Sequence, residues 1–559
     1  MMGVSKLKEQ INEWLNISEF KSELESLTNA EIENRFNHLI TFGTGGMRAI
    51  MEAGTNRMNI YTVRLATTGL AKQIIHDELD RKVVIAYDTR INSERFAKEA
   101  AQTLLYYGID AYLFKEARPT PMLSFAVRHY KASAGIMITA SHNPKAYNGY
   151  KLYGKDGGQL TPEAVGYVKN VMEESVSTIT ELPSASDLEP TYILDEVESA
   201  YQKALLALRR QDSKKDLSIV YTPLHGTGLY PITQALKTFG YDNVHLEPAQ
   251  AKLDGSFPTV DYPNPEEQSA FHLAEQLGQD LSADILIATD PDADRLGVAI
   301  RHNNNFVYLS GNQLGALLLN YKLTLLKETN ELPANGVAIK TIVTSELGRK
   351  IAASFGVEME DTLTGFKYIS EKIEAYTQTN KKTFLFGYEE SYGYLLEDFA
   401  RDKDAIQAAL AVCEMAEMYK QDKQTLIDAL NILYETHGYH KEKLISIELD
   451  PLNGNTEVTA LMDKFMQPTK ALKSDLNIRS IENYLTSKQI TRDDTVSELT
   501  LPKENVVKYH LADQAWLCFR PSGTEPKMKV YIGVVAKTDK LAQTQIDTLE
   551  NTIKNHIAL

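Results

Sequence analysis

The sequence contains few of the residues on which cross-linked or membrane-bound proteins depend. Only two of its 559 residues are cysteines, Cys413 and Cys518, and they do not form a CxxC pair. This excludes a disulfide framework and favours a reducing, cytoplasmic compartment. No stretch is long and apolar enough to span a bilayer, and the opening segment MMGVSKLKEQINEWLN lacks the apolar run of a signal peptide. No membrane role is therefore expected.

Positive charge is also scarce. The chain has 59 Lys and Arg residues against 75 Asp and Glu residues, a formal net charge of -16. This balance disfavours nucleic acid as a partner. With 43% hydrophobic and 24% charged residues, the composition is that of a globular protein. The length suffices for several hydrophobic cores, about three to five domains.

Strand and helix patterns alternate along most of the chain. Residues 82–87 (KVVIAY) predict a strand, and residues 93–107 predict the helix that follows it. Three regions of this kind predict doubly wound α/β layers. Residues 175–187 and 303–305 are predicted to be loops, and His437-Gly438 is predicted to follow a helix.

The last part of the chain has a different pattern. Strands are predicted around residues 516–519 and 528–534, followed by a closing helix over residues 541–557. This arrangement predicts a smaller α+β domain at the C-terminus.

A polar loop, TASHNPKAYN at residues 139–148, directly follows the apolar run 134–138. Ligands bind at the carboxyl ends of strands in open α/β sheets, so Ser141 and its neighbours are candidate site residues. An ordinary polar turn is the alternative, because Ser, Asn and Pro are common turn formers. No GxSxG elbow surrounds Ser141, which disfavours hydrolase chemistry.

Three carboxylates follow another apolar run, residues 285–288. Asp290, Asp292 and Asp294 are spaced so that three oxygens can converge on one divalent cation. Carboxylates suit Mg²⁺, Mn²⁺ or Ca²⁺ rather than zinc. An EF-hand is excluded because Arg295 and Arg301 stand where its loop requires Gly and Glu. An acidic surface turn remains the alternative.

Two further loops combine groups that suit ligands, a sugar in one loop and a phosphate in the other. Residues 387–394 (GYEESYGY) follow the apolar run 384–386 and offer carboxylates and a hydroxyl that can accept hydrogen bonds from sugar hydroxyls. An acidic turn without a ligand is the alternative. Residues 520–527 (RPSGTEPK) combine a guanidinium, two hydroxyls and a glycine. A phosphate dianion requires such donors and a close backbone approach.

Together, the four loops resemble the α-D-phosphohexomutase superfamily, and closely its phosphoglucomutase branch of the bacterial type. The resemblance covers nearly the whole chain and rests on TASHNPKAYNGYK (139–151), DPDADR (290–295), GYEESYG (387–393) and RPSGTEPK (520–527). Weaker matches occur in the family's order: TFGTGGMR (41–48), YDTR (87–90), FPTV (257–260), PNPE (263–266), TLTGFK (362–367) and RDKD (401–404).

Some positions within these motifs leave alternatives open. Ala49 stands where the family commonly has Gly, which concerns the backbone at that point. Tyr388 separates Gly387 from Glu389, and this difference concerns how a sugar would be bound. Arg90 and Lys403, in two of the weaker motifs, could instead be solvated charges.

The resemblance implies three similar α/β domains plus a smaller C-terminal α+β domain around a central cleft. Each domain would contribute one loop. The expected domains are residues 1–205 with the phosphoserine loop, 206–310 with the metal loop, 311–437 with the sugar-binding loop and 438–559 with the phosphate-binding loop.

The resemblance also implies residue roles. Ser141 would carry a phosphoryl group and complete a Mg²⁺ site with Asp290, Asp292 and Asp294. His142 and Lys151 are the candidates for the general base and acid, and Arg295 would assist near the phosphoserine. The residues implied in substrate binding are Arg48, Gly365, Lys367, Glu389, Ser391, Lys403, Arg520, Ser522, Gly523 and Thr524, with Lys527 as a further candidate.

The activity implied is an isomerase reaction, the interconversion of glucose 1-phosphate and glucose 6-phosphate with glucose 1,6-bisphosphate as intermediate and activator. A phosphomannomutase or phosphopentomutase with the same mechanism is the alternative within this class. A non-catalytic sugar-phosphate sensor is disfavoured by the intact serine and aspartates, and a phosphatase by the lack of a separate water-activating residue. Monomer and dimer both remain open.

Overall fold

The computed structural model describes residues 4–43, 45–185, 187–209, 215–448, 454–521 and 527–557. The chain forms two compact units. The first comprises residues 1–314 and 365–425, and the second comprises residues 315–364 and 426–559. The expected third domain, residues 311–437, contributes to both units. The four domain boundaries therefore stay a prediction.

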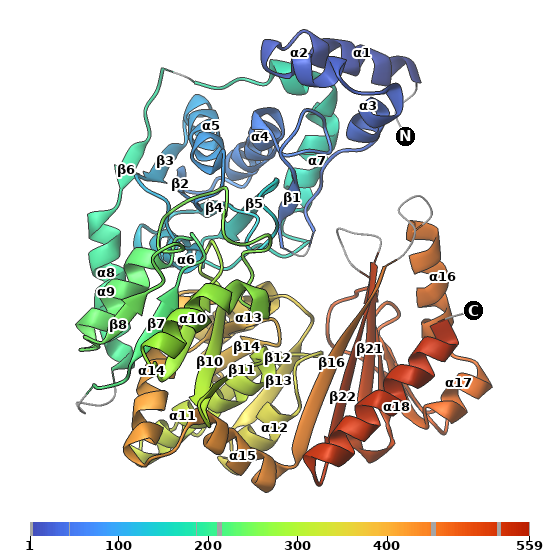
Figure 1. Cartoon of the computed structure of the whole chain (residues 1–559). Coiled ribbons are helices and arrows are strands. Elements are labelled where there is room, and N and C mark those ends of the chain that lie inside the picture. The colour runs from blue at the N-terminus through green and yellow to red at the C-terminus, as the bar shows by residue number, and fades with distance from the viewer. Residues whose placement is uncertain are drawn as a thin grey trace. The chain divides into compact units, whose positions relative to one another are not determined.

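The first unit begins with three helices and continues into a six-stranded sheet (Figure 1). The order in this sheet is β1-β5-β4-β2-β3-β6. Its strands are β1 (Met47–Ile50), β2 (Lys82–Tyr87), β3 (Asp110–Phe114), β4 (Ala134–Ile138), β5 (Tyr147–Gly154) and β6 (Thr191–Ile193). The helices of this region are α1 (Val4–Leu15), α2 (Ser18–Glu25), α3 (Asn29–Phe36), α4 (Ile60–His76), α5 (Ser93–Tyr106), α6 (Thr120–His129), α7 (Gly166–Ser175) and α8 (Asp195–Leu205).

Both faces of this sheet are covered, which explains why its central strands are apolar throughout. Val83 and Ile85 of β2 belong to the hydrophobic core that contains residues of α4 and α5. Val84 and Ala86, which point to the opposite face, belong to a second core that contains residues of α6. Figure 1 shows α4 and α5 on one side of the sheet and α6 on the other. A parallel strand buried on both faces must be apolar at every position.

The rest of the first unit contains a second sheet and the elements around the predicted sugar loop. The second sheet has the order β11-β10-β9-β7-β8, in which β7 pairs in parallel with β8 and β9. Its elements are β7 (Ile219–Thr222), α9 (Leu229–Thr238), β8 (Val244–Leu246), α10 (His272–Asp280), β9 (Ile285–Thr289), β10 (Leu296–His302) and β11 (Asn305–Leu309). The remaining elements are α13 (Phe366–Thr379), the antiparallel pair β14 (Thr383–Glu389) and β15 (Gly393–Leu395), and α14 (Ala405–Gln421).

The second unit contains a parallel strand pair and a large antiparallel sheet. Helix α11 (Gly311–Glu328) leads into it and is followed by β12 (Gly336–Thr341), α12 (Leu347–Ser354), β13 (Glu358–Thr362) and later α15 (Leu426–His437). The seven-stranded sheet has the order β16-β22-β21-β20-β17-β18-β19. Its elements are β16 (Tyr439–Glu448), α16 (Gly454–Met466), α17 (Lys470–Asp475), β17 (Ile478–Asn483), β18 (Lys488–Thr491), β19 (Val496–Glu498), β20 (Val507–Leu511), β21 (Trp516–Pro521), β22 (Lys527–Ala536) and α18 (Asp539–Ile557).

The structure confirms the expected α/β class with an added sheet-rich C-terminal part. The strand predicted at residues 82–87 is β2, and the helix predicted at residues 93–107 is α5, which ends at Tyr106. The prediction of a loop over residues 175–187 is wrong in part, because Val176–Glu181 form a 3-10 helix. Val176 and Ile179 are buried in the first core, and this packing favours the helix over a solvated loop. None of the described helices has the length and apolarity needed to cross a bilayer.

Candidate functional site

Ser141 lies three residues beyond the end of β4, at the carboxyl edge of the first sheet. Its backbone is in the left-handed region, with φ of 52°. A non-glycine residue in such a conformation costs on the order of 1 to 3 kcal/mol and persists where surrounding contacts hold it. The Ser141 N–H donates to Thr139 Oγ1 at 2.8 Å, and the side chain is buried. The left-handed conformation of Ser141 is therefore held by contacts of the folded chain.

The Ser141 hydroxyl reaches the second predicted loop. Its Oγ donates a hydrogen bond to Asp290 Oδ2 at 2.7 Å, between residues 149 positions apart in the chain. The adjacent His142 Nδ1 lies 3.2 Å from the same Oγ. Burial, with added repulsion from Arg295 and Arg48, lowers the pKa of His142 well below its usual value. Serine, imidazole and carboxylate thus meet at one point of the first unit.

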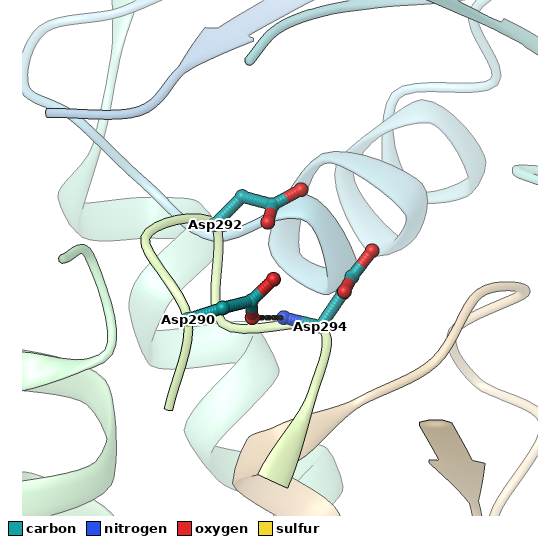
Figure 2. Close-up of side chains that lie close together, drawn as sticks. All are labelled: Asp290, Asp292 and Asp294. Carbon is teal, nitrogen blue, oxygen red and sulfur yellow. Dashed lines mark hydrogen bonds between the residues drawn. The ribbon is translucent and has the colours of Figure 1, made fainter. Parts of the chain in front are cut away.

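The three predicted metal ligands converge. Asp290, Asp292 and Asp294 extend from the loop that follows β9, and each offers one oxygen within 4.8 Å of the others (Figure 2). The backbone helps to close this loop, because Asp290 Oδ1 accepts the N–H groups of Asp294 at 3.1 Å and of Arg295 at 3.0 Å. All three side chains are buried. The alternative of an acidic surface turn is therefore excluded.

The oxygens of this cluster fit a hard divalent cation. Within the described part of the chain, the buried atoms Asp292 Oδ1 and Asp294 Oδ1 have no hydrogen-bond partner. Burial and the two neighbouring carboxylates raise the pKa of Asp290 well above its usual value. Three close carboxylates repel one another unless positive charge is supplied, and oxygen ligands suit Mg²⁺, Mn²⁺ or Ca²⁺. The cluster can therefore hold one divalent metal ion.

Two buried lysines compensate part of this negative charge. Lys151 Nζ lies 2.7 Å from Asp292 Oδ2 and 3.4 Å from Asp294 Oδ2. Lys403 Nζ lies 3.1 Å from Asp294 Oδ2 and 3.0 Å from Asp402 Oδ1. The interpretation of Lys403 as a solvated charge is wrong, because the residue is only 8% exposed. Within the cluster, the lysines contact the Oδ2 atoms of Asp292 and Asp294 and not the Oδ1 atoms, which have no hydrogen-bond partner among the described residues.

The two predicted arginines of this region are also engaged. Arg48 Nη1 donates to Asn143 Oδ1 at 3.0 Å, which ties the 41–48 segment to the serine loop. Arg295 forms an ion pair with Glu266, and its Nε lies 3.8 Å from Asp294 Oδ1. The PNPE segment therefore contributes Glu266 to the surroundings of the metal loop.

The predicted sugar residues meet at the end of β14. Glu389 Oε1 accepts the N–H of Gly365 at 2.9 Å, so Gly365 adjoins the 387–393 loop. Burial raises the pKa of Glu389 to about 7. A Cβ at Gly393 would lie 2.1 Å from Lys403 Cδ, so a larger residue there would displace the Lys403 side chain. Lys367 is buried, and Ser391 lies partly exposed between β14 and β15.

The predicted phosphate residues belong to the second unit. Arg520, in β21, has its Nε 3.4 Å from Glu504 Oε1. Lys527, the first residue of β22, has its Nζ 3.2 Å from Glu448 Oε1. Ser522, Gly523 and Thr524 lie outside the described residues. The phosphate loop therefore stays a prediction.

Sequence reasoning missed two side chains that hold this site. The hydroxyl of Thr120 donates to Asp292 Oδ2 at 2.8 Å, and its N–H donates to the Asp292 carbonyl at 2.9 Å. The Tyr153 hydroxyl donates to Asp402 Oδ2 at 2.8 Å and so fixes the carboxylate that pairs with Lys403. Thr120 is 172 residues from Asp292, and no local pattern could have linked the two.

The Thr120→Val variant is expected to bind divalent metal about 10- to 100-fold more weakly, as is common when the hydrogen bond that orients a ligand is lost. Together with Lys151, Thr120 fixes Asp292 Oδ2 and leaves Oδ1 directed elsewhere. Calorimetric titration with Mn²⁺ measures the affinity. Thr120→Ser should bind as the wild type does. Thr103→Val, which removes another buried helical hydroxyl, one bonded to the Glu99 carbonyl, is the matched control. Equal affinity for Thr120→Val and the wild type would contradict the role.

Comparisons with known proteins indicate the same family along most of the chain. Models of the family phosphoglucomutase/phosphomannomutase match residues 39–178 as α/β/α domain I, 199–303 as domain II and 310–435 as domain III. A phosphoglucomutase of Staphylococcus haemolyticus is 39% identical over 91% of this chain and 93% of its own length. A phosphoglucomutase of Staphylococcus saprophyticus is 36% identical over 95% of this chain and 97% of its own.

Solved structures show the same fold. A phosphoglucomutase/phosphomannomutase family protein of Burkholderia thailandensis matches with a TM-score of 0.65 and 17% identity, covering 92% of this chain and 97% of that one. The phosphoglucomutase pp63/parafusin of Paramecium, in its open form, matches with a TM-score of 0.66 and 17% identity, covering 92% and 95%.

Proposed function

The chain belongs to the phosphoglucomutase/phosphomannomutase family of the α-D-phosphohexomutase superfamily, and from that premise we propose that it is a phosphoglucomutase. It interconverts glucose 1-phosphate and glucose 6-phosphate through a phosphoserine at Ser141. The observation that carries the proposal is the 2.7 Å bond from Ser141 Oγ to Asp290, inside the metal site. A protein that only binds a phosphosugar has no need of a phosphoryl acceptor there.

In this proposal Asp290, Asp292, Asp294 and an oxygen on Ser141 would hold a metal ion, Mg²⁺, which would supply positive charge against that of the phosphoryl group. Basic residues around the metal site position the carboxylates and the transferring group. Lys151 and Lys403 orient two of the carboxylates, and Arg295, held by Glu266 and close to Asp294, would assist at the transferring group.

The reaction proceeds by two phosphoryl transfers. The bond from phosphorus to Ser141 Oγ breaks as a bond forms to the free hydroxyl of bound glucose 1-phosphate, giving glucose 1,6-bisphosphate. The hydroxyl proton passes to a base, and the serine oxygen receives a proton from an acid. His142 and Lys151 are the two groups that fill these roles. The bisphosphate turns over, its other phosphate returns to Ser141, and glucose 6-phosphate leaves.

The substrate is held through its sugar and its second phosphate. Glu389 and Ser391 accept hydrogen bonds from sugar hydroxyls, with Gly365 placed beside Glu389 by its N–H. Arg48, Lys367 and Lys403 supply positive charge. Arg520, with residues 522–524 and Lys527, binds the phosphate that does not react. Exclusion of water protects the phosphoserine from hydrolysis.

Initial rates with three substrates test the function. Glucose 1-phosphate, mannose 1-phosphate and ribose 1-phosphate are compared, each with Mg²⁺ and a trace of its bisphosphate, and the product is followed directly. We expect a clear preference for glucose. Faster turnover of the mannose or ribose substrate would keep the mechanism and change the sugar. No turnover of any of the three would instead indicate a sensor.

Arg520→Ala is expected to raise the KM for glucose 1-phosphate about 10- to 100-fold with a smaller change in kcat. It removes a charge-assisted contact to phosphate worth about 1.5 to 3 kcal/mol. Steady-state kinetics separate the two constants. Arg492→Ala removes another arginine of the same unit, one whose Nη1 bonds to Asn477 at the surface, and should change neither constant. An unchanged KM in Arg520→Ala would argue against phosphate binding by this residue.

A further inference from the structure

Arg90 lies in the loop after β2, next to the serine loop. Strands β2 and β4 pair in parallel, with Tyr87 opposite Ile138, so the loops that follow them leave the sheet at the same edge. The Arg90 side chain has no exposed surface. The interpretation of Arg90 as a solvated charge is therefore wrong. A fully buried guanidinium requires hydrogen-bond acceptors on every side.

Those acceptors are four backbone carbonyls of the serine loop. Arg90 Nη1 donates to the carbonyl oxygens of Pro144 at 2.9 Å and Tyr147 at 3.1 Å. Nη2 donates to the carbonyls of Ser141 and Asn143, each at 2.5 Å. One side chain therefore joins the beginning, the middle and the end of the segment that presents Ser141.

A second set of contacts fixes Arg90 itself. Its Nε lies 3.2 Å from Asp88 Oδ2, which also accepts the Thr139 hydroxyl at 2.6 Å. Thr139 Oγ1 in turn accepts the Ser141 N–H at 2.8 Å. On another side the Phe257 ring lies with its centroid 5.0 Å from the guanidinium carbon. The buried charge is thus balanced by one carboxylate and covered by one aromatic ring.

From these contacts we infer that Arg90 is the positioning residue of the catalytic serine loop. It holds the four carbonyls in place, and with them the left-handed conformation of Ser141 that directs Oγ to Asp290. Lysine cannot replace it, because an ammonium is a single point with three donors and cannot span four carbonyls as a planar guanidinium does. The inference rests on the proposed function, since it assigns Arg90 to the presentation of the reacting serine.

Arg90→Lys tests the inference, because it keeps the charge and removes the planar fork. We expect kcat to fall by at least about 100-fold, the effect of a small misplacement of a reacting group. The KM should change much less than kcat, because Glu389, Ser391 and Arg520, which bind the sugar and its second phosphate in the proposal, lie outside this loop. Amide hydrogen exchange should rise in residues 139–148, where the wild-type loop is held.

Arg64→Lys is the matched control. Arg64 is also a largely buried arginine of the first unit, and it bonds to Glu99 and to the Leu182 carbonyl rather than to the serine loop. This variant should keep kcat and the exchange of residues 139–148. If both variants lost activity only in proportion to a loss of folded protein, the specific role of Arg90 would be refuted. Wild-type kcat and wild-type exchange in Arg90→Lys would refute it as well.

Two further measurements keep the inference testable. If Arg90→Lys does not fold, Phe257→Leu removes the ring over the guanidinium and keeps an apolar side chain. It should raise exchange in residues 139–148 and lower kcat to a smaller extent, and wild-type values of both would overturn the inference. If the wild-type enzyme turns over no phosphosugar, the proposed function fails, but loop exchange in Arg90→Lys still decides whether Arg90 holds the loop.

Discussion

The Ser141→Ala variant is expected to lose mutase turnover by on the order of 10⁴-fold or more, as removal of a covalent nucleophile does in other enzymes. Alanine retains the backbone and the small volume of serine but has no oxygen to receive or give a phosphoryl group. In the proposed reaction Ser141 Oγ gives the phosphoryl group in the first half-reaction and receives one in the second, so neither half-reaction can proceed without it. The loss should appear in kcat.

Two readouts separate lost chemistry from lost structure. Intact-mass spectrometry after incubation with glucose 1,6-bisphosphate should show one added phosphoryl group on the wild type and none on Ser141→Ala. Ser133→Ala provides the control, since Ser133 lies just before β4, at the opposite end of the strand from Ser141, and bonds to the Asp80 carbonyl. It should keep both turnover and phosphorylation. Near-native turnover by Ser141→Ala would refute the covalent mechanism.

The Asp292→Asn variant is expected to show the second-largest effect, a loss of turnover of about 10³-fold or more. A bound cation contributes several kcal/mol to stabilising charge in the transition state. Asn has almost the same shape as Asp but lacks the charge, and Asp292 carries one of the two oxygens of the three-aspartate cluster that are buried without a hydrogen-bond partner among the described residues. Divalent-metal affinity should fall by more than about 100-fold, beyond the loss expected for an outer contact such as Thr120.

Metal binding and turnover are measured together in this test. Calorimetric titration gives the affinity, and initial rates over a range of Mg²⁺ concentrations show whether excess metal restores activity. Asp284→Asn is the matched control, because Asp284 immediately precedes β9 and bonds to Ser218 and Lys420 at the far end of the strand from Asp292. Asp284→Asn should leave both quantities unchanged. If Asp292→Asn bound metal as tightly as the wild type, the ligand set would have to be revised.

Local patterns in the sequence were enough to find several elements and the loops that carry the candidate site residues. The apolar runs before Ser141, Asp290 and Glu389 correspond to β4, β9 and β14, whose apolar side chains are almost all buried, and a strand covered on both faces has to be apolar at each position. Predictions failed where packing over long distances decided the conformation. The 3-10 helix at Val176–Glu181 forms because Val176 and Ile179 reach the first core, which the polar composition of that segment does not show.

The same division holds for the site. The amino-acid sequence by itself determined which chemical groups are available: a serine and three carboxylates in loops after strands, two lysines and several arginines. The tertiary structure alone decided which oxygens these groups present, because Thr120 and Lys151 occupy one oxygen of Asp292 while the other stays unpartnered among the described residues. It also decided the role of Arg90, whose hydrogen bonds to the serine loop depend on the pairing of β2 with β4. Hydrogen bonds form between atoms that the fold brings within about 3 Å of each other, and separation along the chain carries no record of such distances.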